Sequence, residues 1–530
     1  MIALQTAAPE FYSDLGDVLR LFYGDVTVAD ASDRPVPEDA EAVFVHTFET
    51  ADGCWLDRWR CGDAETLRRT PVCEGHPIEI KRQRKRAVKS GLYDLLKALT
   101  GRRPPWGSLT GIRPTRLLYE GMDEGLTRGE AVQRVVDEFD VTPDRAQLLG
   151  EIAEMQTGLL HPAANEFDLY IGIPFCATRC SYCSFASGEI GDGRLVAPYV
   201  DALEREIEQC GEMMRARGLK LRAGYIGGGT PTAIPCGELE RVLAAAQRAF
   251  PGAAEWTVEA GRPDTIDREK LRMLKAHAVT RISVNPQTFS DETLRLVGRA
   301  HTGEDTVRAF QMAREEGFDD VNMDLIAALP GETVDVFARS LEKVMALAPE
   351  SVTVHALAIK RSSRLHEQLH VQEGRHNQVS ADGAAEMIAL ARRELTTGGW
   401  KPYYLYRQKY MAGNLENVGY AKPGRACLYN IGNMEETASV LALGAGAITK
   451  WLFDQDLKAV RQGYDPEELR FSNLQLRIER APNVRNIEQY IQRVDEMVQR
   501  KRALILPEAA RCGGGVRRCC WRRARCSAAA

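Results

Sequence analysis

The sequence predicts an α/β fold in which a partial (β/α)6 barrel of TIM type lies between an N-terminal α/β domain and a C-terminal cap. From about residue 165, short β-rich runs alternate with longer segments of helical periodicity. A segment dense in Pro and Gly, residues 101–114, separates this region from a mixed one before it. The 530 residues, 44% hydrophobic and 27% charged, are enough for several folded domains.

Six strand candidates alternate strictly with helix candidates, which predicts parallel βα units. The strands are expected at 168–173, 222–227, 256–259, 281–284, 321–326 and 352–356. The helices between them are expected at 197–215, 237–250, 267–276, 304–316 and 334–347. Units of this kind curl into a full or partial barrel, and the chemistry of such barrels gathers at the carboxyl ends of the strands.

The remaining segments differ from the barrel in composition. Residues 1–125 are expected to form the N-terminal α/β domain, with strand-like apolar runs at 42–47 and 54–59 and a basic run at 81–89. Residues 126–164 are expected to be a helical linker, 165–360 the barrel and 361–500 the cap. Residues 501–530, rich in Arg and Cys without an apolar face, indicate a disordered tail. A zinc or nucleic-acid role is the alternative for that tail.

The composition excludes several classes of protein. The 69 basic and 74 acidic side chains give a net charge of −5, which makes nucleic acid an unlikely partner. Thirteen unevenly spaced cysteines in 530 residues do not form a disulfide scaffold. The sequence has no run of 18 apolar residues and no signal peptide at its start, so we expect a cytoplasmic protein without a membrane span.

Three cysteines follow the first expected barrel strand at the spacing Cys-x-x-x-Cys-x-x-Cys: Cys176, Cys180 and Cys183. Soft thiolates suit iron-sulfur clusters, and one tight loop can bring three of them to three corners of a cubane. The fourth iron would then be open to a small chelating ligand. The alternatives are a zinc site, which normally requires a fourth protein ligand, and a set of inert buried thiols.

The triplet and its flanking segments resemble the radical S-adenosylmethionine (SAM) superfamily. Segments 169–176 (LYIGIPFC), 227–232 (GGGTPT), 281–289, 322–326 (NMDLI) and 329–331 (LPG) are similar to the oxygen-independent coproporphyrinogen III oxidase family. Segment 104–115 (PPWGSLTGIRPT) resembles the HemZ-type branch of that family. The resemblance covers nearly all of the chain except the tail.

This resemblance implies a set of cofactors and site residues. Cys176, Cys180 and Cys183 would hold a [4Fe-4S] cluster, and S-adenosyl-L-methionine would bind its open iron. Gly228 and Gly229 have no side chains, so a ligand can approach the backbone closely. Carboxylates can bind ribose hydroxyls, and arginine can pair with the cofactor carboxylate. The residues that match cofactor-binding positions are Tyr170, Tyr182, Gly228, Gly229, Thr230, Glu259, Gln287, Arg299, Asp324 and Ala358.

The resemblance further implies the oxidative decarboxylation of coproporphyrinogen III to protoporphyrinogen IX in haem synthesis. The partners would be a porphyrinogen or haem-like tetrapyrrole and a reduced electron donor such as flavodoxin or ferredoxin. Side chains expected to meet the anionic tetrapyrrole at the barrel mouth are Tyr406, Arg407, Lys409 and Tyr410.

Two positions depart from the family pattern. Phe185 stands where a fourth cysteine follows the triplet in the best-understood oxidases, and Gly172 stands where they have a histidine. Relatives with three cysteines include haem chaperones, so a haem-binding protein on the same scaffold is the first alternative function. A radical enzyme that acts on RNA through the basic run at 81–89 is the second.

Overall fold

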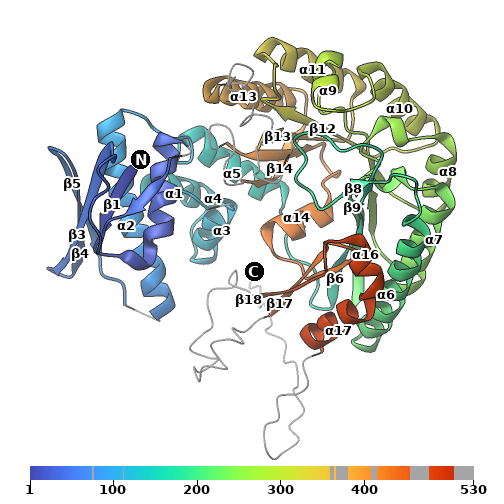
Figure 1. The fold of residues 1–530 in the computed structure, drawn as a ribbon, viewed down its shortest axis with the longest axis horizontal. Helices are drawn as coiled ribbons and strands as arrows, with labels where there is room; N and C mark the ends of the chain where they lie inside the picture. The colour runs from blue at the N-terminus through green and yellow to red at the C-terminus, as the bar shows by residue number, and fades with distance from the viewer. Residues whose placement is uncertain are drawn as a thin grey trace, which may run out of the picture.

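The computed structural model describes residues 1–24, 26–74, 77–111, 113–358, 363, 365, 380–407, 415–453 and 477–506. Its largest part is a curved sheet with a ring of helices around its outside, and the N-terminal sheet stands apart on the left in Figure 1. No helix in these ranges is long and apolar enough to cross a membrane.

Six parallel strands lie side by side in chain order and form the predicted partial barrel. They are β6 (Glu166–Ile173), β9 (Lys220–Gly228), β10 (Glu255–Val258), β11 (Arg281–Ser283), β12 (Val321–Ala327) and β13 (Ser351–Ala356). Each lies within two residues of its expected bounds. A separate pair, β7 (Phe175–Cys176) and β8 (Gly188–Glu189), frames the cysteine loop. The fold class is therefore confirmed.

Helices connect successive strands and cover the outside of the barrel (Figure 1). The expected helices, each displaced by no more than one residue, are α6 (Val196–Ala216), α7 (Cys236–Ala249), α8 (Arg268–Ala276), α10 (Gly303–Glu315) and α11 (Val334–Leu347). An additional helix, α9 (Asp291–Leu296), precedes α10. It spans 6 residues, which is too short to show helical periodicity in the sequence.

The chain after β13 extends the sheet at both edges. Beyond β13 lie β15 (Asn417–Ala421) and β14 (Lys401–Tyr406), which follows α13 (Ala381–Thr397). Beyond β6 lie β16 (Val440–Leu443), β17 (Ile448–Phe453) and β18 (Arg477–Pro482). The chain ends with α16 (Ile487–Gln492) and α17 (Val494–Ile505), which pack on α6. The cap role predicted for 361–500 stays a prediction. The expected start of the tail, residue 501, falls inside α17, and residues 507–530 lie outside the described ranges.

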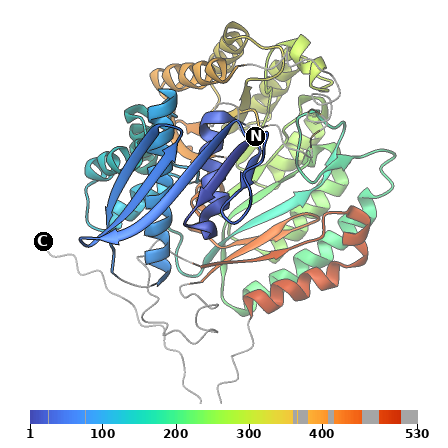
Figure 2. The ribbon, with the colours of Figure 1, turned by 60° about the vertical axis from the view of Figure 1, so that its left-hand side comes forward.

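The N-terminal unit has its own hydrophobic core, formed by residues from Ile2 to Leu96. Figure 2 brings its sheet forward; the strand order is β2-β1-β3-β4-β5. The strands are β1 (Ile2–Thr6), β2 (Val28–Asp30), β3 (Ala42–Ala51), β4 (Cys54–Cys61) and β5 (Ala64–Pro71), and the helices are α1 (Tyr12–Tyr23) and α2 (Pro77–Thr100). The two apolar runs expected to be strands are the beginning of β3 and most of β4.

Side chains from Trp106 onward belong to the core of the barrel instead. They include residues of α3 (Thr115–Asp123), α4 (Arg128–Phe139) and α5 (Pro143–Met155). Within residues 126–164, expected to be a helical linker, the structure has two helices, α4 and α5. The break follows from Asp140, which adopts a left-handed conformation at φ 55, and from Pro143, which starts α5.

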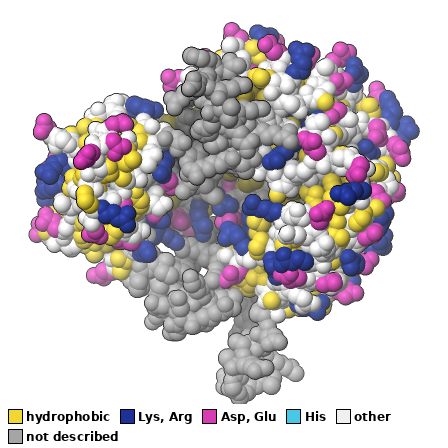
Figure 3. Space-filling view, in the orientation of Figure 1, with side chains coloured by type: hydrophobic (Ala, Val, Ile, Leu, Met, Phe, Trp, Pro, Cys, Tyr) yellow, Lys and Arg dark blue, Asp and Glu magenta, His cyan; other side chains and the backbone are white. Residues whose placement is uncertain are grey.

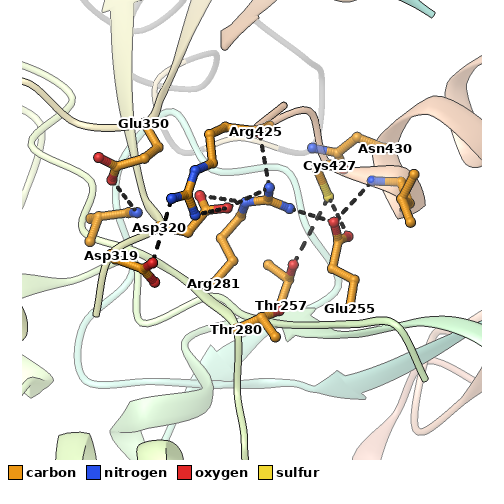
Figure 4. A network of polar contacts seen from close by, with 12 residues as sticks. Glu255, Thr257, Thr280, Arg281, Asp319, Asp320, Glu350, Arg425, Cys427 and Asn430 are labelled. Carbon is orange, nitrogen blue, oxygen red and sulfur yellow. Dashed lines mark hydrogen bonds and ion pairs between the residues drawn. The ribbon is translucent and has the colours of Figure 1, made fainter. Parts of the chain in front are cut away.

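Charged side chains close the amino ends of the barrel strands, as Figure 4 shows. Arg281, at the start of β11, donates to both carboxylate oxygens of Asp320 at 3.0 and 2.9 Å and to Glu255 at 2.8 Å. Glu255 also accepts from the Cys427 thiol at 3.1 Å and from the backbone N–H of Leu428 at 3.1 Å. Leu428 begins α14 (Leu428–Glu435), so the Glu255 carboxylate caps this helix and fixes it beneath the barrel.

Candidate cluster and cofactor site

At the opposite end, polar side chains from neighbouring strands meet where the strands end. Tyr225 on β9 donates to Glu259, just after β10, at 2.6 Å. Asn285, just after β11, donates to Asp324 on β12 at 2.7 Å, and His355 on β13 lies 3.7 Å from the same carboxylate. Because these side chains come from consecutive parallel strands, the barrel itself brings them together at its carboxyl face.

The cysteine loop lies against the end of β9. The backbone N–H of Gly229 donates to the carbonyl of Ile173 at 2.8 Å, and that of Thr230 donates to Phe175 at 2.7 Å. The Thr230 hydroxyl lies 3.6 Å from the Sγ of Cys176. The glycine segment expected to bind the cofactor is therefore in direct contact with the first cysteine of the triplet.

The other two cysteines lie in the turn that follows. The Cys183 N–H donates to the Cys180 carbonyl at 3.1 Å. Arg262 donates to the Thr178 carbonyl at 2.9 Å and places a nitrogen 4.0 Å from the Sγ of Cys180. These contacts link the cysteine loop to the segment that follows β10.

The donor set fits an iron-sulfur cluster. All three cysteines of the triplet are free thiols with partial exposure. Among the described residues, no three His, Cys, Asp or Glu side chains converge on one point. Cluster ligation does not require such convergence, because each thiolate binds a different iron. Cys176, Cys180 and Cys183 are thus the residues that would hold the cluster.

The glycine segment beside Cys176 leaves no room for side chains. Gly228 adopts φ +109, where a Cβ would be strained, and that Cβ would lie 3.3 Å from the Tyr170 hydroxyl. A Cβ on Gly229 would lie 2.5 Å from the Phe175 carbonyl oxygen. Bare backbone at this position lets the end of β9 pack directly on the cysteine loop beside Cys176. We call Gly228 to Thr230 the glycine cradle.

Substitution of Gly229 by alanine is expected to weaken SAM binding by at least about tenfold, because the new Cβ forces the cradle away from Phe175. All three cysteines are retained, so the reconstituted variant should still bind iron, and SAM affinities are compared at equal iron content. Equilibrium dialysis with SAM and an iron assay check both results. Gly237→Ala on α7 is the matched control, since a Cβ there meets nothing within 4 Å. Unchanged SAM affinity in the Gly229 variant would contradict the placement of the cofactor.

Two predicted cofactor residues have buried polar atoms that lack a hydrogen-bond partner among the residues the structure describes. These atoms are the Oε1 of Gln287 and the Nε of Arg299. Gln287 sits at φ 65, and its backbone N–H donates to the Asp324 carbonyl at 2.9 Å. Orphaned buried polar groups are rare, and a bound ligand satisfies them. The backbone hydrogen bond brings Gln287 and Asp324 together at the carboxyl end of the barrel.

Most of the Arg299 guanidinium is already engaged. It donates to the Tyr182 hydroxyl at 3.2 Å and to the carbonyls of Gly261 and Asn285 at 2.9 and 3.1 Å. The structure therefore joins Arg299 to Tyr182, another predicted site residue, and leaves its Nε for a ligand.

The two remaining predicted residues occupy opposite sides of the barrel. Tyr170 on β6 stacks with Tyr225 and Tyr429 at ring centroid distances of 6.3 and 6.2 Å. Ala358, just beyond β13, packs against the hydrophobic core of the barrel. The cofactor roles of both, like those of the other site residues, stay predictions.

Glu259 is the titratable group of the site with the clearest perturbation. Burial, with a smaller contribution from Asp324, raises the pKa of Glu259 to about 7, although the hydrogen bond from Tyr225 and the proximity of His355 oppose the rise. A carboxylate that accepts ribose hydroxyls must be ionised, and the ionised fraction grows about tenfold between pH 6 and 8.

We therefore expect SAM to bind about tenfold more tightly at pH 8 than at pH 6, and Glu259→Gln to remove most of this dependence while keeping the shape of the side chain. Equilibrium dialysis across this pH range measures it. An equally steep profile in the glutamine variant would show that another group titrates.

The sequence did not single out Asn285, His355 or Arg262, although each lies at or within four residues beyond the end of a barrel strand.

The sequence predicted that Arg407 lies at the barrel mouth. Instead, Arg407 is buried, donates to the carbonyls of Leu109 and Gly111 at 3.0 and 3.2 Å, and stacks over Trp106. Tyr406 contacts His355 at 3.4 Å, and Lys409 and Tyr410 lie outside the described ranges.

Comparison with known proteins identifies the family of the chain. Residues 170–344 match the family model of the radical SAM superfamily. The chain is 38% identical over 397 residues to the oxygen-independent coproporphyrinogen-III oxidase-like protein HemZ of Bacillus subtilis, covering 74% of this chain and 78% of that protein. It is 30% identical over 281 residues to the haem chaperone HemW of the same organism, covering 52% and 69%. Among solved structures, Escherichia coli coproporphyrinogen III oxidase (HemN) aligns with a TM-score of 0.49 at 23% identity over 65% of this chain and 73% of that one.

Proposed function

The chain belongs to the radical SAM family of oxygen-independent coproporphyrinogen-III oxidase-like proteins, which use a [4Fe-4S] cluster and S-adenosyl-L-methionine, and we propose that it oxidatively decarboxylates coproporphyrinogen III. In each conversion one propionate would lose a hydrogen atom to the radical, one electron to an external one-electron acceptor, and carbon dioxide, and would become a vinyl group. The observation that carries the proposal is the arrangement of three free cysteines directly beside the glycine cradle at the carboxyl face of the barrel.

The residues of this face have distinct roles in the proposal. Cys176, Cys180 and Cys183 hold the cluster, and the backbone of Gly228 to Thr230 receives the amino-acid end of the cofactor. Glu259 accepts hydrogen bonds from the ribose. When bound, cluster and cofactor together supply a carbon-centred radical that removes the hydrogen atom from the substrate. A reduced flavodoxin or ferredoxin is the electron donor that we propose.

Aromatic side chains fill the barrel below this face. Tyr225 and Tyr429 stack with ring centroids 4.5 Å apart, and Tyr170 stacks on both. This aromatic layer takes up space beneath the cofactor site that water would otherwise occupy. Exclusion of water protects a reactive intermediate from side reactions.

A haem chaperone is the second candidate function. The similarity to HemW favours it, and so do Phe185 and Gly172, which replace residues of the best-understood oxidases. The Phe185 side chain is 70% exposed beside the cysteine loop, where an apolar ring could meet a flat macrocycle.

Anaerobic reconstitution followed by incubation with SAM, a reductant and coproporphyrinogen III distinguishes the two functions. The proposal expects 5′-deoxyadenosine together with products that lack one or two carboxyl groups by mass spectrometry. If 5′-deoxyadenosine forms without any decarboxylated product, the oxidase function fails while the cofactor site stands. Stoichiometric haem binding and transfer to an apo-haemoprotein, without turnover, would then establish the chaperone.

A further inference from the structure

A basic pocket of about 210 Å³ lies between α2 and the start of α3, outside the cluster site. Its walls come from α2, the loop from Ser108 to Pro114 and the first turns of α3. In Figure 3, Lys and Arg side chains gather in the hollow between the N-terminal sheet and the barrel, where these helices lie. Six cationic residues line the pocket: Arg82, Lys85, Arg86, Lys89, Arg113 and Arg116.

Helical geometry explains how one basic run divides between two faces of α2. Arg82, Arg86 and Lys89 follow one another at spacings of four and three residues, so they share the face that lines the pocket. Arg84 points to the N-terminal sheet, where it pairs with Asp57 at 2.7 Å and stacks over Phe48 at 3.8 Å. Arg84 is thus structural, whereas its neighbours surround a cavity.

The lining of the pocket is strongly basic, with six cationic residues and one acidic residue. The acidic residue, Glu120, is shared by Arg86 at 3.0 Å and by Arg82 and Arg116 at 4.0 Å each. Acids outside the lining offset part of the remaining charge: Lys85 pairs with Asp14 at 3.5 Å, and Arg113 pairs with Glu436 at 3.0 Å. Cationic donors therefore predominate on the surface that faces the cavity.

Lys89 is a buried cation of the pocket whose side chain donates to a neutral partner, the Thr110 hydroxyl, at 2.6 Å. Burial lowers the pKa of Lys89 to about 8, and Asp14 and Asp17 oppose the fall more than Lys85 and Arg407 add to it. An anion in the pocket would offset the cost of burying this ammonium and would accept from several charged donors at once.

We propose that this pocket binds a compact polyanion, a small molecule that carries two or more phosphate or carboxylate groups. Arginine forks match both kinds of oxyanion. The volume of about 210 Å³ lies below the roughly 300–1,000 Å³ of pockets for drug-sized ligands, which favours a compact ligand over a nucleic acid. The site is separate from the proposed function and does not depend on it.

The pocket also joins two parts of the fold. Arg82, Arg86 and Lys89 belong to the helix that packs on the N-terminal core, whereas Arg113 and Arg116 belong to the segment that packs on the barrel. The carbonyls of Leu109 and Gly111, both in the pocket wall, accept from Arg407 at the end of β14. A polyanion bound between them would therefore fasten the N-terminal unit to the barrel.

Isothermal titration of the reconstituted 530-residue chain at physiological salt tests the proposal, with inorganic pyrophosphate and citrate as separate probes. We expect at least one of them to bind with 1:1 stoichiometry and to raise the unfolding temperature. Binding of pyrophosphate alone would indicate a phosphorylated ligand, and binding of citrate alone would indicate a small polycarboxylate.

Lys89→Gln and Arg86→Gln should each weaken this binding at least tenfold. Lys81→Gln is the matched control, because Lys81 is an exposed lysine on the same helix that does not line the pocket. Circular dichroism verifies that the variants fold, and Lys89→Gln retains a side chain that can bond to Thr110. The proposal is overturned if no probe binds, if Lys81→Gln weakens binding as much as Lys89→Gln, or if only a single-stranded RNA binds in a way that depends on Lys89.

Discussion

Replacement of Cys180 by alanine is expected to abolish the cluster and, with it, the formation of 5′-deoxyadenosine. Three thiolates are the smallest set that can hold a cubane with one open iron, so the loss of one removes the position at which SAM is activated. We expect the yield of 5′-deoxyadenosine to fall at least about a thousandfold, which corresponds to about 4 kcal/mol of lost transition-state stabilisation. Iron content, visible absorbance and chromatography of the nucleoside products measure the result.

Cys236→Ala provides the matched control. Cys236 is a free, partly exposed thiol like those of the triplet, but it begins α7 on the outside of the barrel. Its removal should leave iron content and nucleoside yield unchanged. A Cys180 variant that keeps both its iron and its SAM cleavage would show that the cysteine triplet is not the ligand set.

The barrel could be predicted from the sequence because its signals are local. Each of its strands is a short apolar or β-branched run, and helices such as α6 and α11 repeat apolar residues at helical spacing. The cysteine triplet is local as well, since its three members lie within eight residues of one loop.

Elements without such local signals were missed. β5 has a single large apolar residue, Leu67, which is exposed, and the strand forms because its whole length pairs with β4. Its partner, not its own sequence, determines its conformation.

Part of the site depends on contacts between distant segments. His355 reaches Asp324 from a neighbouring strand, and Arg262 reaches the Cys180 loop across more than 80 residues. Conversely, Arg407 follows a Tyr-rich strand, which suggested the barrel mouth, yet the loop from Trp106 to Gly111 covers it. Neither set of contacts can be predicted from the local sequence, because the partners come together only when the sheet has formed.

The same two strands carry acidic residues at both ends of the barrel. Glu255 and Glu259 are four residues apart around β10, and Asp320 and Asp324 are four apart around β12, so all four point to the same side of the sheet. At the amino ends, Arg281 neutralises Glu255 and Asp320. At the carboxyl ends the corresponding acids are held by neutral Tyr225 and Asn285, which leaves their charge for a ligand. One end therefore serves stability, and the other presents the polar groups to which our proposal assigns binding.

Arg281→Met should accordingly destabilise the fold by about 3–5 kcal/mol, because it leaves the buried carboxylates of Glu255 and Asp320 without the guanidinium between them. Burial already raises the pKa of Asp320, and Arg281 is the main group that opposes the rise. In the variant the folded-state pKa of Asp320 rises further above its unfolded value. Stability from this group is then present at low pH and lost as pH rises through the folded-state pKa, so the deficit should be smaller at pH 5 than at pH 8.

Urea unfolding of both proteins at the two pH values measures this difference. Arg268→Met on α8 is the matched control, since Arg268 also bridges two acids, Glu315 and Glu316, but is 48% exposed. Exposed pairs contribute at most about 1 kcal/mol, and the control should show little dependence on pH. Equal losses in the two variants would mean that the charges beneath the barrel are as well hydrated as those on its surface, and that the Arg281 network does not hold α14 in place.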